Sequence, residues 1–111
     1  MGWMKDETGL DRNPANFVAL TPLSFLQRAA AVFPDHTAII YGGTRRTYRE
    51  YHARVGRLTS ALGRRGVGPG DVVATLLPNI PAQAEAHFGV PAAGAVLNAI
   101  NTRLDVDTVG Y

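Results

Sequence analysis

The chain has 111 residues, of which 46% are hydrophobic and 18% charged, and its formal net charge is +2. This composition is typical of a globular protein and excludes a wholly disordered chain, and a chain of this length is expected to bury roughly two-thirds of its unfolded surface in one domain. It contains no cysteine, which excludes a disulfide framework, a thiolate zinc site and a cysteine nucleophile.

The first segment, residues 1–20, is expected to be an arm that precedes the domain, because Gly9, Pro14 and two asparagines fall within it. Its first 13 residues include five charged side chains and no apolar core, so it does not resemble a signal peptide. The most apolar stretch, residues 80–100, is interrupted by polar side chains and is therefore unlike a bilayer span. We expect a cytoplasmic protein without a membrane span.

A helix and a hairpin are predicted next. Thr21-Pro22 offers an N-cap and a first-turn proline, apolar residues then recur at helical spacing, and Pro34-Asp35 ends the helix. The run 37–41 is typical of a strand, Gly42-Gly43 of a tight turn, and 44–47 of the returning strand.

A second helix is predicted from Thr47, which forms a capping box with Glu50. Gly66 is placed to end this helix in the left-handed conformation. Its apolar side chains recur on one stripe, formed by Tyr51, Val55, Leu58 and Leu62.

A βαβ unit follows the second helix. Residues 72–77 are apolar on both faces and predict a buried parallel strand, and Asn79 is expected to cap a helix that starts at Ile80-Pro81. Residues 95–100 predict a second buried strand, and a last helix begins at Asp105. Strand, helix and strand within about 30 residues indicate a βαβ unit, so the predicted class is α/β, a short hairpin followed by a parallel βαβ unit with flanking helices.

The predicted sheet is small for its type. Parallel strands are normally covered on both faces and continued sideways, and the last helix has no stop signal before Tyr111. We therefore expect residues 21–111 to be an incomplete, truncated domain.

Common active-site motifs are missing. The glycine-rich segment 66–70 precedes a strand, whereas a phosphate-binding loop must follow a strand and open a helix, so we interpret it as a connecting turn. The histidines His36, His52 and His87 lack a metal-ligand spacing, and His87 is expected to be a packed or hydrogen-bonded structural residue. No nucleophilic triad is supported, and we assign no catalytic or metal-binding residue.

Positive charge is concentrated between residues 45 and 65, which contain seven arginines and a single acidic residue, Glu50. Such a patch suits the phosphates of a nucleic acid or nucleotide, and it is equally typical of a solvated helix face. We favour the solvated face and expect no nucleic-acid partner, because no stacking aromatics alternate with the arginines.

One candidate site follows from the predicted topology. In open α/β sheets, ligands bind outside the carboxyl ends of the strands, which here are Pro78-Asn79 and the segment Asn101, Thr102, Arg103. The amide, hydroxyl and guanidinium groups of this second segment suit phosphate or adenine recognition. The alternative is that Asn101 and Thr102 only cap the following helix.

The order of these segments resembles the start of the AMP-forming acyl-CoA synthetases, within the adenylate-forming enzymes. The similarity covers about residues 20–111, and the subgroup that it resembles most contains plant acyl-activating enzymes and bacterial methylmercaptopropionyl-CoA-type ligases. Four runs carry it: LTPLSFL from Leu20, AIIYG from Ala38 with Thr47-Tyr48, GDVV from Gly70 with LPNIP from Leu77, and HFGVPAAGAVL from His87 leading to NTRLD from Asn101.

The resemblance implies an ATP-dependent fatty acid or carboxylic acid–CoA ligase that forms an acyl-adenylate and then a CoA thioester, with ATP, Mg²⁺ and CoA. It also implies that the phosphate loop and catalytic lysine lie beyond Tyr111, so the segment alone is expected to be inactive. In related acetyl-CoA synthetases, the loop corresponding to Ile100-Asn101-Thr102 lies against the CoA nucleotide, although that loop is glycine-rich and this one is not. A second copy of the chain is a candidate partner.

Two alternatives from other classes remain open at this point. One is a stand-alone, non-catalytic module that binds a partner through the exposed edge of the sheet. The other is a small arginine-rich nucleic-acid-binding protein.

Overall fold

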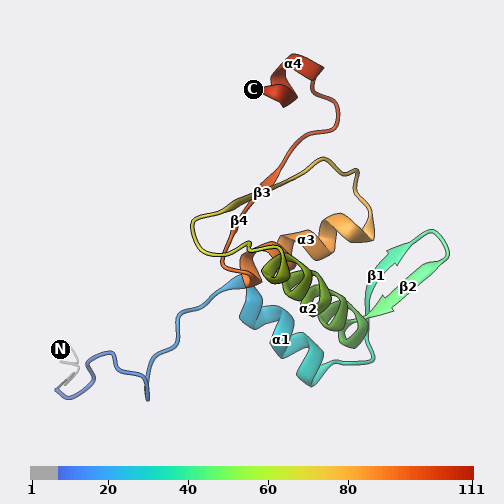
Figure 1. The fold of residues 1–111 in the computed structure, drawn as a ribbon. Helices are drawn as coiled ribbons and strands as arrows, with labels where there is room; N and C mark the ends of the chain where they lie inside the picture. Colours follow the sequence, from blue (N-terminus) through green and yellow to red (C-terminus); the bar gives the residue numbers. More distant parts are fainter. Residues whose placement is uncertain (1–7) are drawn as a thin grey trace, which may run out of the picture.

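The computed structural model describes residues 8–111, so the first seven residues of the predicted arm lie outside the described part. Helices and strands follow one another as predicted (Figure 1), and the α/β class with a hairpin and a parallel βαβ unit is confirmed. The elements are α1 (Pro22–Val32), β1 (Thr37–Tyr41), β2 (Thr44–Thr47), α2 (Tyr48–Arg64), β3 (Val72–Thr75), α3 (Pro81–Ala92), β4 (Val96–Ala99) and α4 (Val106–Gly110).

The hairpin of β1 and β2 leads directly into α2. The two strands are antiparallel, with Tyr41 opposite Thr44 and Thr37 opposite Thr47. The predicted capping box then starts α2: the Glu50 amide donates to Thr47 Oγ1 at 3.2 Å, and the Thr47 amide donates to Glu50 Oε2 at 2.9 Å. These two bonds satisfy amides that would otherwise lack a partner at the start of the helix.

The end of α2 is set by Gly66, as predicted. Its φ of 81° lies in the left-handed region, which glycine adopts without steric penalty. The Gly66 amide donates to the Gly63 carbonyl and the Val67 amide to the Leu62 carbonyl, a Schellman motif that closes the helix. The chain can therefore turn back toward β3 immediately after α2.

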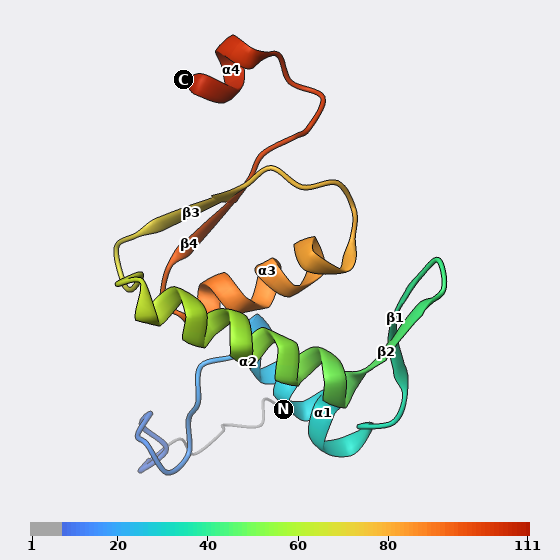
Figure 2. The ribbon, with the colours of Figure 1, turned by 45° about the vertical axis from the view of Figure 1, so that its right-hand side comes forward.

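Strands β3 and β4 form a parallel pair joined by α3, with Val72 beside Val96 and Thr75 beside Ala99. The expected burial on both faces is wrong, because Val72 is 64% and Val96 60% exposed. Figures 1 and 2 show the reason: α1, α2 and α3 lie on one side of this sheet, and no element of residues 8–111 covers the other side. The predicted cap is also wrong by one residue, since the N-cap of α3 is Ile80 and Asn79 precedes it.

The core lies where α1, α2 and α3 meet the base of the hairpin. Leu26, Tyr51 and Val55 form its buried centre, and the Tyr51 ring meets the Phe88 ring edge to face at 5.7 Å between centroids. Such an aromatic pair adds about 0.5–1.5 kcal/mol beyond the area that it buries. This cluster packs α3 against α2 and thereby positions one side of the candidate site.

The chain leaves more surface exposed than its length predicted. It exposes 8662 Å², against about 5,900 Å² for a compact monomer of this mass. Its radius of gyration is 18.8 Å, against about 13 Å for a compact domain of this length. The expected two-thirds burial is therefore wrong, because residues 8–20 and α4 extend away from the other helices and one sheet face is bare (Figure 2).

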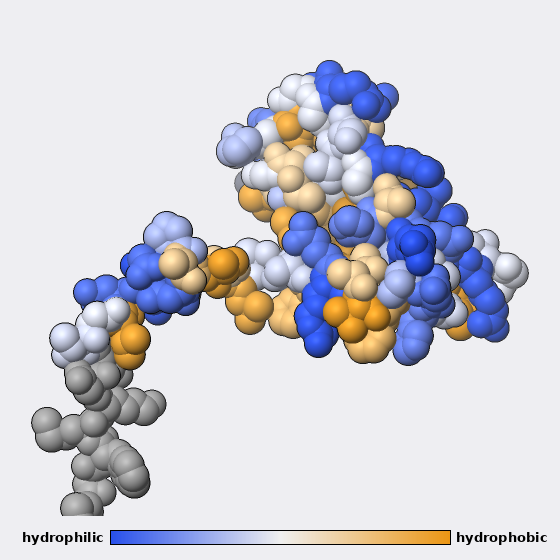
Figure 3. Space-filling view, turned by 90° about the horizontal axis from the view of Figure 1, so that it is seen from below, coloured by the Kyte–Doolittle hydropathy of each residue, from blue (hydrophilic) through white to orange (hydrophobic). Residues whose placement is uncertain are grey.

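The underside of the molecule shows how this exposure is distributed. Figure 3 shows residues 8–20 extending away from the body and apolar side chains in small patches between hydrophilic ones. Exposed apolar side chains also occur on α1, where Phe25 is 58% and Val32 54% exposed. Leu26 is the only buried residue of α1, so only a narrow stripe of this helix packs against the core.

Candidate functional site

A cleft of about 700 Å³ lies at the carboxyl ends of β3 and β4. The loop after β3 contributes Leu77, Pro78 and Asn79, and α3 contributes Gln83 and His87. The other wall is the end of β4 and the loop after it, formed by Ala99, Ile100, Asn101, Thr102 and Arg103. The structure thus brings the three predicted site residues and Asn79 into one cleft, at the sheet edge where open α/β sheets bind ligands.

The loop after β4 has a structure of its own. Asn101 Oδ1 accepts a hydrogen bond from the Arg103 amide at 3.0 Å, which makes an Asx turn. Helix α4 begins at Val106 and its N-cap is Asp105, so the alternative that Asn101 and Thr102 cap this helix is wrong. The side chains of this loop are exposed along the cleft.

Charges of both signs lie near this loop. The Arg103 guanidinium is the positive group in the cleft lining. Further along the chain, Thr108 Oγ1 donates to the Asp105 carboxylate, and this hydrogen bond holds the pKa of Asp105 below its usual value.

The α3 wall of the cleft carries two polar groups one helical turn apart. Gln83 is only 9% exposed, and its Oε1 has no hydrogen-bond partner among residues 8–111. His87 Nδ1 lies 2.8 Å from the Gln83 main-chain oxygen, so His87 is hydrogen-bonded as predicted. Because a carbonyl oxygen only accepts, Nδ1 must carry the proton in this contact.

Gln83 was not predicted as a site residue. The signal that could have found it is its spacing, since residues 83 and 87 lie on the same face of a helix that begins at the carboxyl end of a strand. His87 was considered only as a structural histidine, because a single histidine on a helix does not reveal which cavity it lines.

A smaller, apolar pocket of about 310 Å³ adjoins the cleft. It lies between the hairpin and the start of α3, with Ile39, Ile40 and Ala84 among its lining residues. Asn79, Gln83 and His87 line both cavities and therefore form the boundary between a polar and an apolar space.

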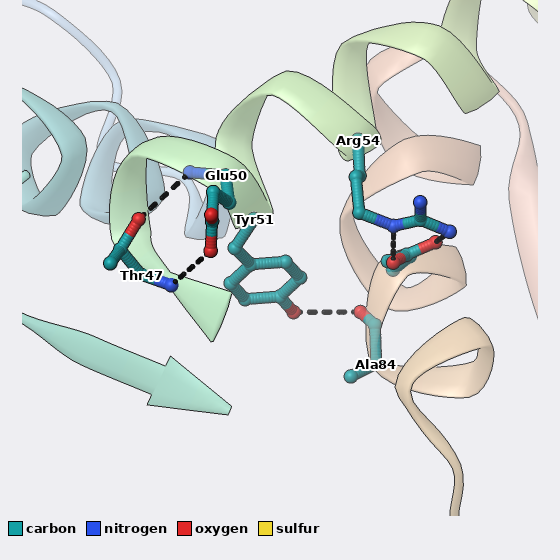
Figure 4. A network of polar contacts seen from close by, with 6 residues as sticks. Thr47, Glu50, Tyr51, Arg54 and Ala84 are labelled. Atoms are coloured by element: carbon teal, nitrogen blue, oxygen red, sulfur yellow. Dashed lines mark hydrogen bonds and ion pairs between the residues drawn. The ribbon is translucent and has the colours of Figure 1, made fainter. Parts of the chain in front are cut away.

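The position of α3 is fixed by polar bonds from α2 (Figure 4). The Tyr51 hydroxyl donates to the Ala84 carbonyl at 2.8 Å, and burial, with the charge of Glu85, raises the pKa of Tyr51 to about 12. Arg54 pairs with the buried Glu85 through Nε and Oε1, and a longer contact of 3.4 Å joins the second guanidinium nitrogen to Oε2. This pairing raises the pKa of Arg54. Both bonds lie in the turn of α3 that carries Gln83.

The arginine-rich segment is consistent with the solvated interpretation. Arg49 pairs with Asp35 at 3.1 Å and Arg54 with Glu85, so carboxylates of the chain itself already meet two of the seven guanidinium groups. Four others are exposed on the surface, namely Arg45, Arg57, Arg64 and Arg65.

The described residues do not fit a metal ion or a phosphate loop. Within residues 8–111, no group of three or more His, Cys, Asp or Glu side chains is arranged to hold a metal, so we assign no residue to Mg²⁺. Segment 66–70 joins α2 to β3 and is the predicted connecting turn. No helix in this part of the chain is both long and apolar enough to cross a bilayer.

Comparison with known proteins identifies a family and several relatives that agree with it. The family of AMP-binding enzymes matches residues 26–111. Acetate/butyrate–CoA ligase AAE7 of Arabidopsis thaliana, a peroxisomal protein, is 51% identical over 107 residues, which is 96% of this chain and 19% of the relative. Benzoate–CoA ligase of the same plant is 50% identical over 95 residues, 86% of this chain and 16% of the relative. The chain thus spans about a fifth of the length of the curated relatives it matches.

Solved structures show the same arrangement. A long-chain-fatty-acid CoA ligase from Rhodopseudomonas palustris superimposes with a TM-score of 0.77 at 42% identity, covering 81% of this chain and 23% of that one. The N-terminal subdomain of NpsA from Klebsiella oxytoca gives a TM-score of 0.76 at 24% identity, covering 80% and 23%, and at this identity the likeness concerns the fold alone. Sequence and fold agree, and this chain belongs to the AMP-binding enzyme family.

Proposed function

We propose that residues 21–111 form part of the N-terminal domain of an ATP-dependent carboxylic acid–CoA ligase, with residues 1–20 as an arm before it. In such a ligase, the carboxylate attacks the α-phosphate of ATP and releases pyrophosphate, and the CoA thiol then displaces AMP from the acyl-adenylate. The observation that carries the proposal is the identity of about half of all residues to acetate/butyrate–CoA ligase AAE7 over 96% of this chain.

The cleft would hold the nucleotide part of CoA, which supplies the attacking thiol when bound. Arg103 offers a guanidinium for a phosphate, and Asn101 and Thr102 offer amide and hydroxyl groups on the same wall. Residues 8–111 supply no identified group for Mg²⁺ or for the phosphates of ATP, so this chain is given no step in adenylate formation.

The substrate acid and the cellular compartment of the ligase are proposed separately. We propose a short- to medium-chain acid within fatty acid metabolism, and cytoplasm as the compartment. AAE7 and benzoate–CoA ligase are named as peroxisomal, so the compartment has to be tested in the source cells. Fractionation with an antibody against this chain would decide it, and recovery with peroxisomes would contradict the cytoplasmic proposal.

A chimera tests the proposal. Residues 1–111 would replace the matching segment of AAE7, and carboxylate-dependent exchange of pyrophosphate into ATP and acetyl-CoA formation would be measured. We expect both activities within about tenfold of AAE7, because a ligase domain rebuilt with a homologous scaffold keeps its downstream catalytic groups. A chimera that has native circular dichroism and elutes as a folded protein, yet catalyses neither reaction, would contradict the proposal.

The purified chain, residues 1–111, should show no carboxylate-dependent exchange of pyrophosphate into ATP. Measurable exchange would refute the proposal that the catalytic groups lie outside this chain.

Sequencing the gene past codon 111 separates the ligase from the stand-alone module. An in-frame continuation with a Ser/Thr/Gly-rich loop and a lysine supports the ligase, whereas a stop codon supports the module.

A further inference from the structure

Residues 8–20 carry apolar side chains that nothing in the described part of the chain covers. Every residue of this segment is exposed, and four apolar side chains in it are between 45% and 83% exposed, namely Leu10, Phe17, Val18 and Leu20. The segment extends away from α1, α2 and α3 (Figures 1 and 3). Single exposed apolar residues are normal on a protein surface, whereas a group of them marks a contact surface.

Part of this segment has a defined local structure, residues 11–17, which we call the hook. The Ala15 amide donates to Asn13 Oδ1 at 2.9 Å, and the Asn13 amide donates to Asn16 Oδ1 at 2.9 Å. The side-chain amide of Asn16 in turn donates to the Asp11 carbonyl at 3.0 Å. Bonds from asparagine side chains to the neighbouring main chain fix a turn. The hook therefore has its shape before a partner binds, which lowers the entropy lost on binding.

The ring of Phe17 lies at the end of the hook, next to a positive charge. The guanidinium carbon of Arg12 is 4.6 Å from the ring centroid, the arrangement of a cation–π contact. Arg12 forms no ion pair within residues 8–111. A surface that fits the hook therefore has an apolar recess for the ring and a carboxylate beside it.

Sequence similarity indicates which molecule carries that surface. The match to AAE7 includes all but four of the 111 residues, so it extends over most of residues 1–20. The match to the AMP-binding family starts only at residue 26. The segment is thus shared with a ligase of which this chain spans 19%, and the rest of such a ligase is the largest surface available to the hook.

We propose that the hook docks on the part of the same ligase molecule that this chain does not include, with Phe17 in an apolar recess and Arg12 against a carboxylate. This inference rests on the proposed function, because the partner surface belongs to the ligase. Docking fastens the start of the N-terminal domain to the rest of the enzyme and covers the apolar side chains of residues 8–20. The partner is part of the same polypeptide and not a second copy of the chain.

Trypsin tests this docking, because it cuts after Arg12 only while the hook is undocked. The AAE7 chimera that carries residues 1–111 is compared with the chain 1–111 alone, and mass spectrometry follows the release of peptides that end at Arg12. We expect release from the chimera to be slower by about tenfold or more. Cleavage after Arg28, inside α1, is the internal control and reports in both samples whether the body is folded.

Substitutions of Phe17 identify the hook as the contact. Phe17→Ala should raise the rate of release from the chimera to that of the chain alone, and Phe17→Leu, which stays apolar, should keep most of the protection. Phe25→Ala is the matched control, because Phe25 is a similarly exposed phenylalanine on α1, and it should leave cleavage after Arg12 unchanged. Full protection in the Phe17→Ala chimera would refute the role of the ring.

The outcomes separate this inference from the proposed function. An active chimera that releases the peptide as fast as the chain alone would overturn the docking and leave the ligase standing. Protection that disappears on dilution of the chimera would also overturn it, because the partner would then be a second copy. A folded chimera that catalyses neither pyrophosphate exchange nor acetyl-CoA formation contradicts the ligase itself, whatever its rate of release.

Discussion

Gly89 of α3 lies so close to Leu58 of α2 that a Cβ at position 89 would stand 2.6 Å from Leu58 Cδ2. The Gly89 carbonyl also accepts a hydrogen bond from Thr59 Oγ1 at 3.0 Å. The two helices can approach this closely only because position 89 has no side chain. Since Gln83 and His87 lie on the same helix, this contact also sets the α3 wall of the cleft.

Gly89→Ala should therefore destabilise the fold by about 1–3 kcal/mol, the usual effect of overpacking a filled interface. Urea denaturation measures the change in the free energy of unfolding. Gly63→Ala is the control: a Cβ there meets nothing within 4 Å, and it should stabilise α2 by about 0.5–1 kcal/mol. Leu58→Ala combined with Gly89→Ala should recover part of the loss; strictly additive effects would contradict the contact.

The Tyr51 hydroxyl predicts a stability change at high pH. Its pKa is raised from 10.0 to about 12, so the native state holds this proton more tightly than the unfolded chain. The resulting stability is complete below pH 10 and is lost as the pH rises through about 12. Tyr51→Phe should therefore flatten the fall in the free energy of unfolding over this window. At neutral pH, Tyr51→Phe should lower the free energy of unfolding by about 0.5–1.5 kcal/mol, because the hydrogen bond to the Ala84 carbonyl is lost.

Tyr41→Phe is the control for this series. Tyr41 is 51% exposed, and its hydroxyl has no hydrogen-bond partner in the described part of the chain, so its removal should leave the pH profile as it is. An identical profile for Tyr51→Phe and the unaltered chain would contradict the role of Tyr51.

The pairing of Arg54 with Glu85 predicts that replacing Arg54 alone destabilises the fold more than replacing both residues. Glu85 is only 7% exposed, so Arg54→Met should leave a buried carboxylate without its partner and destabilise the fold by about 1–3 kcal/mol. Replacing both residues, as Arg54→Met with Glu85→Met, should be milder than Arg54→Met alone, because no charge is then left buried. Thermal unfolding of the three variants measures this, and a double variant less stable than the single one would refute it.

The capping box at Thr47 and Glu50 should be worth about 1 kcal/mol. Thr47→Ala removes the acceptor for the Glu50 amide and should lower the free energy of unfolding by that amount. Thr47→Ser keeps the hydroxyl and should remain near the unaltered value. If Ser and Ala had the same effect, the loss would come from the strand pairing of β2 and not from the cap.

Local signals were sufficient to predict most of this fold. Thr21-Pro22, the Gly42-Gly43 turn, the capping box at Thr47 and the left-handed Gly66 each determine a start or an end through bonds within a few residues, and all lie where expected. Burial was harder to predict, because it depends on what covers a surface. The apolar runs of β3 and β4 correctly indicated a parallel pair, but their second face has no cover among residues 8–111.

The candidate site likewise has features that local sequence predicted and features that depend on packing. Strand ends and helix starts were enough to place Asn101, Thr102 and Arg103 in one cleft with Asn79. The spacing of Gln83 and His87 on the helix after β3 could have indicated that Gln83 lines the cleft, but its burial and its unpaired Oε1 depend on the packed structure. The cap of α3 was assigned one residue early, a difference that depends on backbone angles and not on residue type.

The central claim is that this chain supplies a CoA-facing cleft to an acid–CoA ligase. It is tested most directly by Arg103→Ala in the chimera with AAE7, comparing KM for CoA with the rate of carboxylate-dependent pyrophosphate exchange. A charged hydrogen bond to phosphate predicts a KM for CoA raised by about tenfold or more, with exchange unchanged. An unchanged KM for CoA, or an equal loss of exchange, would contradict the claim.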